Sequence, residues 1–308
     1  MFKLSTLAAA AALMAASAAQ AQVTFNANIE LDPTHTLSHG STTSSTTLGG
    51  RVEVNAESAL VRDADRFVNA RASLIMPVNG DKPSVDDLWL SMGNASADFK
   101  LGRFEAIDLF PVGMDTVVTK ANGDLGYMAN KLRGRVSNKF HGALGSNLAQ
   151  GLRAELGVVA ENASADGTSD DFYGVRPALV YTAGDLSLRA GVEALSNSNN
   201  SAGTVSSSTG YGLSLGYKLT AGQLFVNHAS NSKLDANSTG INFTLGAFGV
   251  GYLMDETAGV KGDTVYLAYK MPLMGLKNAW WTPALSYSKA DNVSDAVTAL
   301  RVRLNYGF

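Results

Sequence analysis

Apolar and polar residues alternate along most of the chain after residue 22. Segment 152–160 shows the pattern clearly, because Leu152, Leu156 and Val158 fall on one face while Arg153 and Glu155 fall on the other. A period of two is typical of β-strands that have one apolar and one polar face. The alternation predicts sixteen strands, at residues 23–31, 48–57, 68–76, 88–92, 98–101, 131–136, 152–160, 173–181, 186–194, 211–219, 223–229, 240–246, 248–254, 265–271, 281–287 and 298–308.

The apolar faces of these segments carry no Asp, Glu, Lys or Arg, and His228 is the one awkward residue on them. A charged side chain facing lipid costs about 2–4 kcal/mol at the bilayer midplane, so a membrane environment explains the exclusion. A soluble β-sandwich also alternates, but it does not need so many strands with aromatic residues at their outward ends. An even number of strands is typical of bacterial outer-membrane barrels. The pattern therefore predicts an all-β fold, a 16-stranded antiparallel transmembrane β-barrel.

The longest connection that does not alternate runs over residues 103–130 and carries the acids Glu105, Asp108, Asp115 and Asp124. Long connections inside compact folds are uncommon and are usually functional. Its glycines, its proline and its large apolar side chains allow it to fold back and pack. We therefore expect this third long loop to fold into the lumen of the barrel and to constrict it.

The first 21 residues have the features of a secretory signal peptide. Lys3 supplies a positive start, residues 7–19 form an apolar core, and Ala19-Gln20-Ala21 is a small-x-small cleavage site. The apolar run is too short for a membrane-spanning helix. We expect cleavage after Ala21, which leaves one barrel domain over residues 22–308.

Composition narrows the function further. The chain has no cysteine, so an exported protein of this sequence is not a disulfide-stapled scaffold. Its net charge is −3, and −4 once Lys3 is removed. So weak a charge argues neither for a nucleic-acid partner nor for a polybasic membrane patch.

The chain ends with Leu304-Asn305-Tyr306-Gly307-Phe308, an alternating segment with a terminal phenylalanine. Together with the signal peptide, the sixteen strands and the long acidic loop after the fifth strand, this end resembles the trimeric general porins of Gram-negative bacteria. The resemblance implies that Tyr306 and Phe308 belong to the signal read by the barrel-assembly machinery. It also implies a homotrimer in the outer membrane, surrounded by lipid and lipopolysaccharide, that passes small hydrophilic solutes and ions.

The resemblance further implies that acids on the third loop face bases on the opposite wall. Rings of charged side chains set ion selectivity in pores. The loop has Phe110-Pro111-Val112-Gly113-Met114-Asp115 where many porins have Pro-Glu-Phe-Gly-Gly-Asp, so the resemblance is weakest there. The matching positions are Glu105, Asp108 and Asp115 on the loop, and Arg51, Arg71, Arg133, Arg135, Arg301 and Arg303 on the wall.

Two other functions remain open. Trp89 and Trp280 fall on inward faces, with Tyr266 nearby in the pattern, and aromatic residues along a lumen are typical of a sugar-selective porin. An outer-membrane hydrolase barrel has a similar length but needs a Ser–His pair on adjacent strands. His35 and His39 have helical metal-ligand spacing within a Ser/Thr-rich loop, so we expect no metal site and no cofactor.

Overall fold

The computed structural model describes residues 23–41, 43–62, 65–121, 126–135, 139–161, 171–199 and 204–308. The expected signal peptide, residues 1–21, lies outside these ranges, as do Asp124 and Val136. Among the described residues, no helix is long and apolar enough to cross a membrane.

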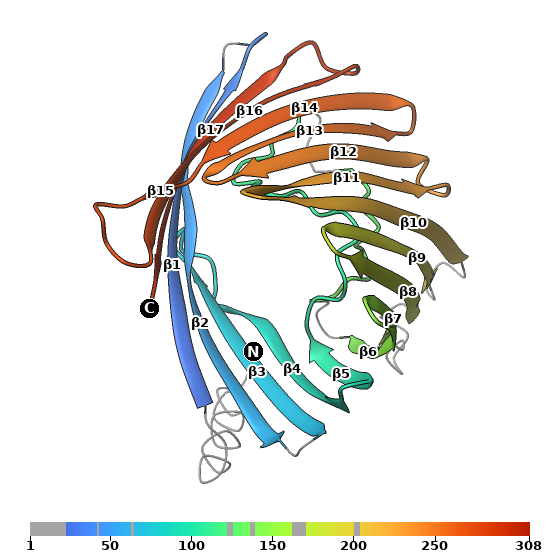
Figure 1. Ribbon diagram of the computed structural model, residues 1–308. Helices are drawn as coiled ribbons and strands as arrows, with labels where there is room; N and C mark the ends of the chain where they lie inside the picture. The colour runs from blue at the N-terminus through green and yellow to red at the C-terminus, as the bar shows by residue number, and fades with distance from the viewer. Residues whose placement is uncertain are drawn as a thin grey trace.

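The described strands form one antiparallel sheet that closes on itself (Figure 1). Strands pair with their sequence neighbours, and the first strand also pairs with the last, so that Ile29 lies opposite Tyr306. Closure leaves no free sheet edge, as lipid requires. The segments are β1 (Val23–Ser38), β2 (Ser44–Arg62), β3 (Arg66–Pro77), β4 (Ser84–Asn94), β5 (Ala97–Arg103), β6 (Phe140–Ala149), β7 (Leu152–Glu161), β8 (Asp171–Ala183), β9 (Leu186–Asn199), β10 (Thr204–Leu219), β11 (Gly222–Asn231), β12 (Ala236–Leu245), β13 (Phe248–Thr257), β14 (Val260–Tyr269), β15 (Met271–Pro272), β16 (Ala279–Ala290) and β17 (Val297–Gly307).

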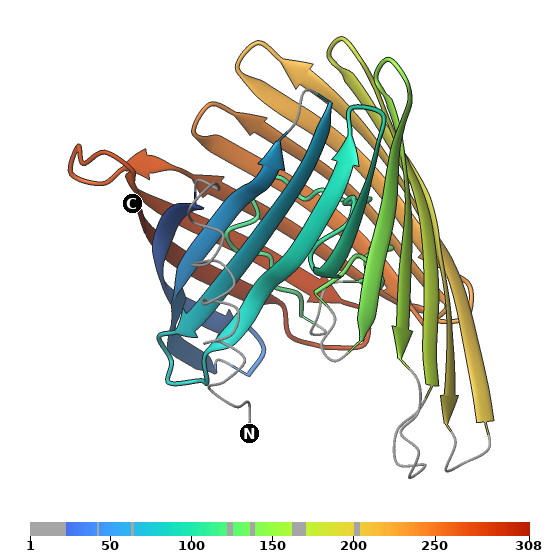
Figure 2. The same cartoon turned by 90° about the horizontal axis from the view of Figure 1, so that it is seen from below.

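The wall has sixteen strands, because β15 continues β14 rather than adding a strand. Both segments pair with β16, and Lys270 alone separates them. The fold class predicted from the alternation, a 16-stranded antiparallel barrel, is confirmed. Figure 2 shows the strands inclined side by side, with short turns at one end of most hairpins. At one such turn Gly184 has φ +58°, the left-handed conformation that tight two-residue hairpin turns need.

The two faces of the wall have the predicted characters. On β10, Leu213, Leu215 and Tyr217 are exposed on the outer face, whereas Ser214 is buried on the inner face. Most strands are longer than the alternation indicated. For β2 the prediction was 48–57, and the strand covers Ser44–Arg62, because the alternation is lost in the polar run 44–47 at its start and in the apolar run 59–61 near its end. The stretch between the predicted strands 48–57 and 68–76 is therefore partly strand.

The sixth predicted strand, 131–136, is wrong. Leu132 is buried over Gly174 of the wall, and Gly134 has φ +139°, so their apolar alternation does not come from a wall strand. The true sixth strand is β6, which pairs with β5 and β7. Its Gly142, Gly145 and Ser146 have the composition of a turn, which is why the alternation predicted no strand between residues 136 and 152. The connection after β5 is therefore 104–139 rather than 103–130.

The connection 104–139 packs against inward-facing residues of the wall. Its Leu109, Phe110 and Tyr127 form a buried cluster with small residues that include Ala178 on β8 and Ala229 on β11. Glycines on β10 leave room for this packing. A Cβ on Gly210 would lie 1.8 Å from the Tyr127 hydroxyl, and one on Gly212 would lie 2.9 Å from the Cβ of Ala129.

Candidate functional site

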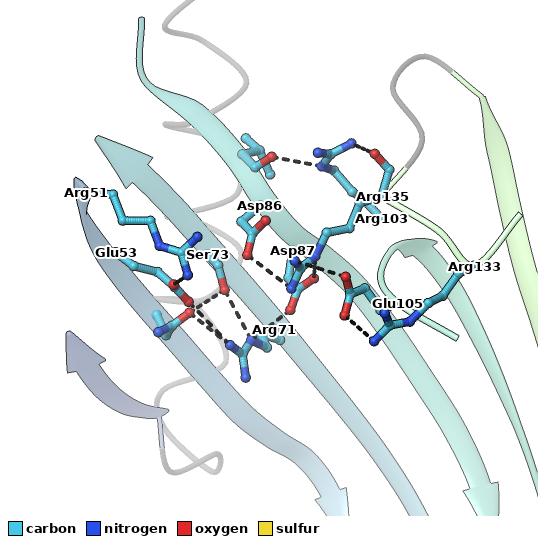
Figure 3. Close-up of polar contacts among 12 residues, drawn as sticks. Arg51, Glu53, Arg71, Ser73, Asp86, Asp87, Arg103, Glu105, Arg133 and Arg135 are labelled. Carbon is cyan, nitrogen blue, oxygen red and sulfur yellow. Dashed lines mark hydrogen bonds and ion pairs between the residues drawn. The ribbon is translucent and has the colours of Figure 1, made fainter. Parts of the chain in front are cut away.

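Charged residues of β2, β3 and β4 form a chain of ion pairs on the inner wall (Figure 3). Arg71 on β3 is its centre, 3.3 Å from the Glu57 carboxylate and 3.2 Å from that of Asp87. Arg51 lies 3.2 Å from Glu53 on the same strand. Arg51, Arg71 and Glu57 are partly exposed, so the pairs among exposed groups stay hydrated and contribute little to stability, whereas Asp87 is buried. We call Arg51, Glu53, Glu57, Arg71, Asp86 and Asp87 the wall cluster.

The two ends of the connection 104–139 meet in a short ladder. Glu105 forms an antiparallel bridge with Gly134, the Ala106 amide donates to the Arg133 carbonyl at 2.6 Å, and the Arg135 amide donates to the Phe104 carbonyl at 2.9 Å. The ladder places Arg133 and Arg135 beside Glu105, at 2.9 and 3.3 Å. We call this paired region, with Asp108, the loop root.

The loop root touches the wall cluster directly. Arg135 lies 3.1 Å from both Asp86 and Asp87 on β4 (Figure 3). Within the connection, Arg133 lies 3.8 Å from Asp108. Arg133 and Arg135 were predicted on the wall, and that assignment is wrong, because both belong to the connection. The loop therefore carries arginines as well as acids, and the wall carries acids as well as arginines.

A third group of charges lies on β1 and β17, next to the closure of the barrel. Arg303 is 3.2 Å from Glu30 and 2.6 Å from Asp32, and Arg301 is 4.0 Å from Asp32. Arg301 also donates to the Thr116 carbonyl of the connection at 2.6 Å. We call Glu30, Asp32, Arg301 and Arg303 the seam cluster.

Asp115 lines a cavity of about 370 Å³ together with Arg303, Lys270 and Asn305. Burial raises the pKa of Asp115 above the ordinary aspartate value of 3.8, although the positive charge of Arg303 opposes the rise. Asp115 therefore lies near the last strand. Its carboxylate is the part of the site that a fall in pH neutralises early.

Two buried ion pairs hold the connection to the wall, and the sequence analysis did not identify either. Arg176 on β8 and Glu193 on β9 lie 3.9 Å apart with side chains 1% and 0% exposed. Lys120 of the connection lies 2.6 Å from Asp255 on β13, and both side chains are 3% exposed. Removing one partner of such a pair typically costs about 3–5 kcal/mol, because the other charge stays buried. The sequence did carry a signal for these pairs, because Arg176, Glu193 and Asp255 are charged residues at inward-facing positions of strands that otherwise hold apolar and small residues.

The last residue closes the barrel through its backbone. Phe308 and Ala27 exchange two hydrogen bonds, of 2.9 Å from the Phe308 amide and 2.7 Å from the Ala27 amide. The Phe308 ring stacks on Tyr306 with centroids 5.7 Å apart. Both rings are exposed on the outer face, as an aromatic belt requires.

Lysines lie over both inward-facing tryptophans. Lys100 is 4.6 Å from the Trp89 ring centroid, and Lys270 is 4.3 Å from that of Trp280. Trp89 also lines a cavity of about 330 Å³ with Glu57 and Asn69.

The histidines occupy other surroundings. His35 contacts the Thr46 hydroxyl at 2.9 Å, and His39 contacts that of Thr298 at 2.7 Å. Within the described part of the chain, no group of three or more His, Cys, Asp or Glu side chains could hold a metal ion.

A family model described as porin-like glycoporin RafY matches residues 13–257. The chain belongs to this family of porins. The porin resemblance noted from the sequence is thereby confirmed, and the protein is an outer-membrane channel. No curated protein sequence matches it.

Solved porin structures share the fold of this porin. An anion-selective porin from Comamonas acidovorans superposes with a TM-score of 0.71 at 15% identity, covering 94% of this chain and 100% of its own. A loop L8 deletion mutant of OmpT, an outer membrane protein of Vibrio cholerae, superposes with a TM-score of 0.62 at 14% identity, covering 94% of this chain and 99% of its own. A Rh. blastica porin with two substitutions superposes with a TM-score of 0.62 at 13% identity, covering 93% of this chain and 100% of its own. At these identities the likeness concerns the fold alone.

Proposed function

We propose that this porin is a general diffusion channel whose narrowest part is lined by the loop root, the wall cluster and the seam cluster. One observation carries the proposal: the connection 104–139 packs on inward-facing residues of β8 to β17 and carries Glu105, Asp108 and Asp115 toward partly exposed arginines. A loop held there narrows the water-filled lumen. Small hydrophilic solutes and ions are the class of substrate that such a passage admits.

The clusters support a weak ion preference. Each of the six predicted arginines lies within 4.0 Å of at least one carboxylate, so the positive charge of every one of them is compensated locally. A pore with compensated charges lacks the single-sign ring that produces strong selectivity. We expect the cation and anion permeabilities to agree within about threefold.

Single-channel recording tests this function. The purified protein in planar bilayers under a salt gradient gives both the conductance and the permeability ratio. A large conductance that does not saturate as the salt concentration rises, with a cation-to-anion permeability ratio near one, supports the proposal. A protein that folds as a barrel and conducts nothing contradicts it.

Export and assembly complete the proposal. A cleaved signal peptide at residues 1–21 delivers the chain, the assembly machinery recognises Tyr306 and Phe308, and three copies associate in outer-membrane lipid and lipopolysaccharide. Small outward residues near the start of the chain, Ala27, Gly50, Ala56, Ala70 and Ala72, favour close packing of one copy against the next. An SDS-resistant trimer that dissociates on heating is the expected result, and a monomer by light scattering in mild detergent contradicts it.

A sugar-selective channel is the second candidate, since the family description names a glycoporin. The observation that favours it is the Trp89 cavity, where an indole ring lies near the carboxylate of Glu57 and the amide of Asn69. An aromatic face beside polar groups suits a sugar ring. Saturable block of the conductance by a sugar, lost in Trp89→Ala, would establish this candidate in place of general diffusion.

The hydrolase alternative has less support. The hydrogen bonds of His35, His39 and His228 go to threonine or tyrosine hydroxyls rather than to serine. We therefore propose a channel without enzymatic activity.

A further inference from the structure

One buried arginine of the wall contacts both limbs of the connection at the loop root. Its Nη2 donates to the Ile107 carbonyl on the outgoing limb at 2.8 Å. On the returning limb, the same guanidinium donates to the Ala129 carbonyl at 3.2 Å and to the Asn130 side-chain oxygen at 3.2 Å. Arg176 thus joins two segments more than twenty residues apart to one point on β8, a task that the planar fork of arginine suits.

Glu193 completes the attachment from the neighbouring strand. Its carboxylate accepts the backbone amides of Lys131 at 3.4 Å and Leu132 at 3.1 Å, in the turn that follows Asn130 on the returning limb. Hydrogen bonds to a carboxylate are stronger than neutral ones. Glu193 also compensates the charge of Arg176, so the pair can remain buried.

The same residues fix a charge of the constriction. Asn130, which Arg176 holds, donates its side-chain amide to the Asp108 carboxylate at 3.0 Å, and the Phe110 amide donates to the same oxygen at 2.9 Å. The other carboxylate oxygen lies 3.8 Å from Arg133. The position of Asp108 relative to Arg133 therefore depends on both limbs being held at Arg176.

We propose that Arg176 and Glu193 are positioning residues that set the ion preference of the channel by holding Asp108 against Arg133. The inference rests on the proposed diffusion function. Neither residue needs to meet the permeating ion, since both are buried beneath the loop root. Their effect passes through the placement of Asp108.

The connection supplies a matched control. The Lys120–Asp255 pair is also a buried ion pair between charged side chains at the loop–wall contact, and Ser238 donates to Asp255 at 2.5 Å. Lys120 is not bonded to Glu105, Asp108 or Arg133 in any described contact. Replacing this pair also disturbs a buried contact between the connection and the wall, but at residues that do not belong to the loop root.

The test replaces each pair by apolar residues, so that the net charge stays constant. Such replacements of buried pairs by residues of similar volume are usually tolerated, and heat-modifiable mobility checks that the barrels assemble. The variants are Arg176→Met with Glu193→Leu, and Lys120→Met with Asp255→Leu. The permeability ratio is measured for each variant alone and in an Asp108→Asn background. Arg176→Lys is added because it keeps the charge but lacks the fork.

Replacement of the Arg176–Glu193 pair is expected to change the permeability ratio about twofold or more, and Arg176→Lys to change it in the same direction. The change should disappear in the Asp108→Asn background, because coupled residues do not act additively. Replacement of the Lys120–Asp255 pair should leave the ratio unchanged. An unchanged ratio, or the same change with and without Asp108, would overturn the inference. If Asp108→Asn as a single substitution still changes the permeability ratio in that case, the proposed function is upheld even though the inference fails.

Discussion

Arg303 donates two hydrogen bonds to the carboxylate of Asp32, at 2.8 Å from Nε and 2.6 Å from Nη2. The two residues lie on the last and first strands, which pair to close the barrel. Fork-to-fork pairs of this kind are both strong and geometrically specific. The arginine is therefore compensated by its own wall, and the transverse field expected from acids on one side and bases on the other is reduced.

This pairing predicts opposite effects of two substitutions. Asp32→Asn leaves Arg303 and Arg301 less compensated and should shift permeability toward anions, whereas Arg303→Ser leaves Asp32 and Glu30 in excess and should shift it toward cations. We expect the permeability ratio to change about twofold. The change should be larger at low salt, because charges act over about one Debye length, which is about 10 Å at 0.1 M and longer at lower salt. Reversal potentials in a salt gradient provide the measurement. Asp263→Asn is the control, because this acid accepts a hydrogen bond from exposed Tyr252 and belongs to none of the three charge clusters. Shifts of the reversal potential with the same sign in Asp32→Asn and Arg303→Ser would refute compensation.

The charges of the site were predictable from sequence, but their partners were not. The inward positions of Arg51, Arg71, Arg301 and Arg303 follow from strand periodicity, which depends only on neighbouring residues. Which acid compensates each arginine depends on register between strands. Asp32 was assigned to a loop because the apolar alternation stops at Leu31, although β1 continues to Ser38.

The sequence predicted that a long connection follows the fifth strand, but it did not predict where that connection ends. Its acids and its length marked it as functional. Leu132 and Gly134 alternate as strand residues do, so Arg133 and Arg135 were placed on the wall. Their true position depends on burial of Leu132 and on the bridge between Glu105 and Gly134, which are long-range packing effects.

Asp115 predicts a dependence of ion preference on pH. Because burial raises its pKa, the carboxylate gains a proton as the pH falls, at a pH above the ordinary value of 3.8. Loss of this negative charge beside Arg303 should move permeability toward anions at a pH above that at which an ordinary aspartate gains its proton. In Asp115→Asn the ratio at neutral pH should already resemble the wild-type ratio at the lower pH, and this early step should be missing. Identical pH profiles for the two proteins would show that Asp115 does not face the conduction path.

Shortening the connection should widen the channel. Replacing residues 112–119 by two glycines removes Val117, which packs on Ala268, Ala284 and Ala299, and removes the Thr116 carbonyl that binds Arg301. We expect higher single-channel conductance and faster swelling of liposomes in larger sugars, at some cost in heat stability. Removing 273–276 from the turn before β16 is the control, and should leave the size limit unchanged. An unchanged size limit in the shortened variant would mean that the connection does not constrict the pore.

The closing strand predicts separate roles for the backbone and the side chain of Phe308. Deleting the residue removes both hydrogen bonds to Ala27 and leaves polar backbone groups unpaired where the barrel closes, which lipid penalises. Phe308→Ala keeps those bonds but removes the ring that stacks on Tyr306. If the ring is the part recognised during assembly, both variants should reduce heat-modifiable barrel in the outer membrane severalfold, and Phe308→Tyr should restore it. If closure alone matters, Phe308→Ala should assemble normally while the deletion fails. Normal assembly of the deletion variant would rule out both roles.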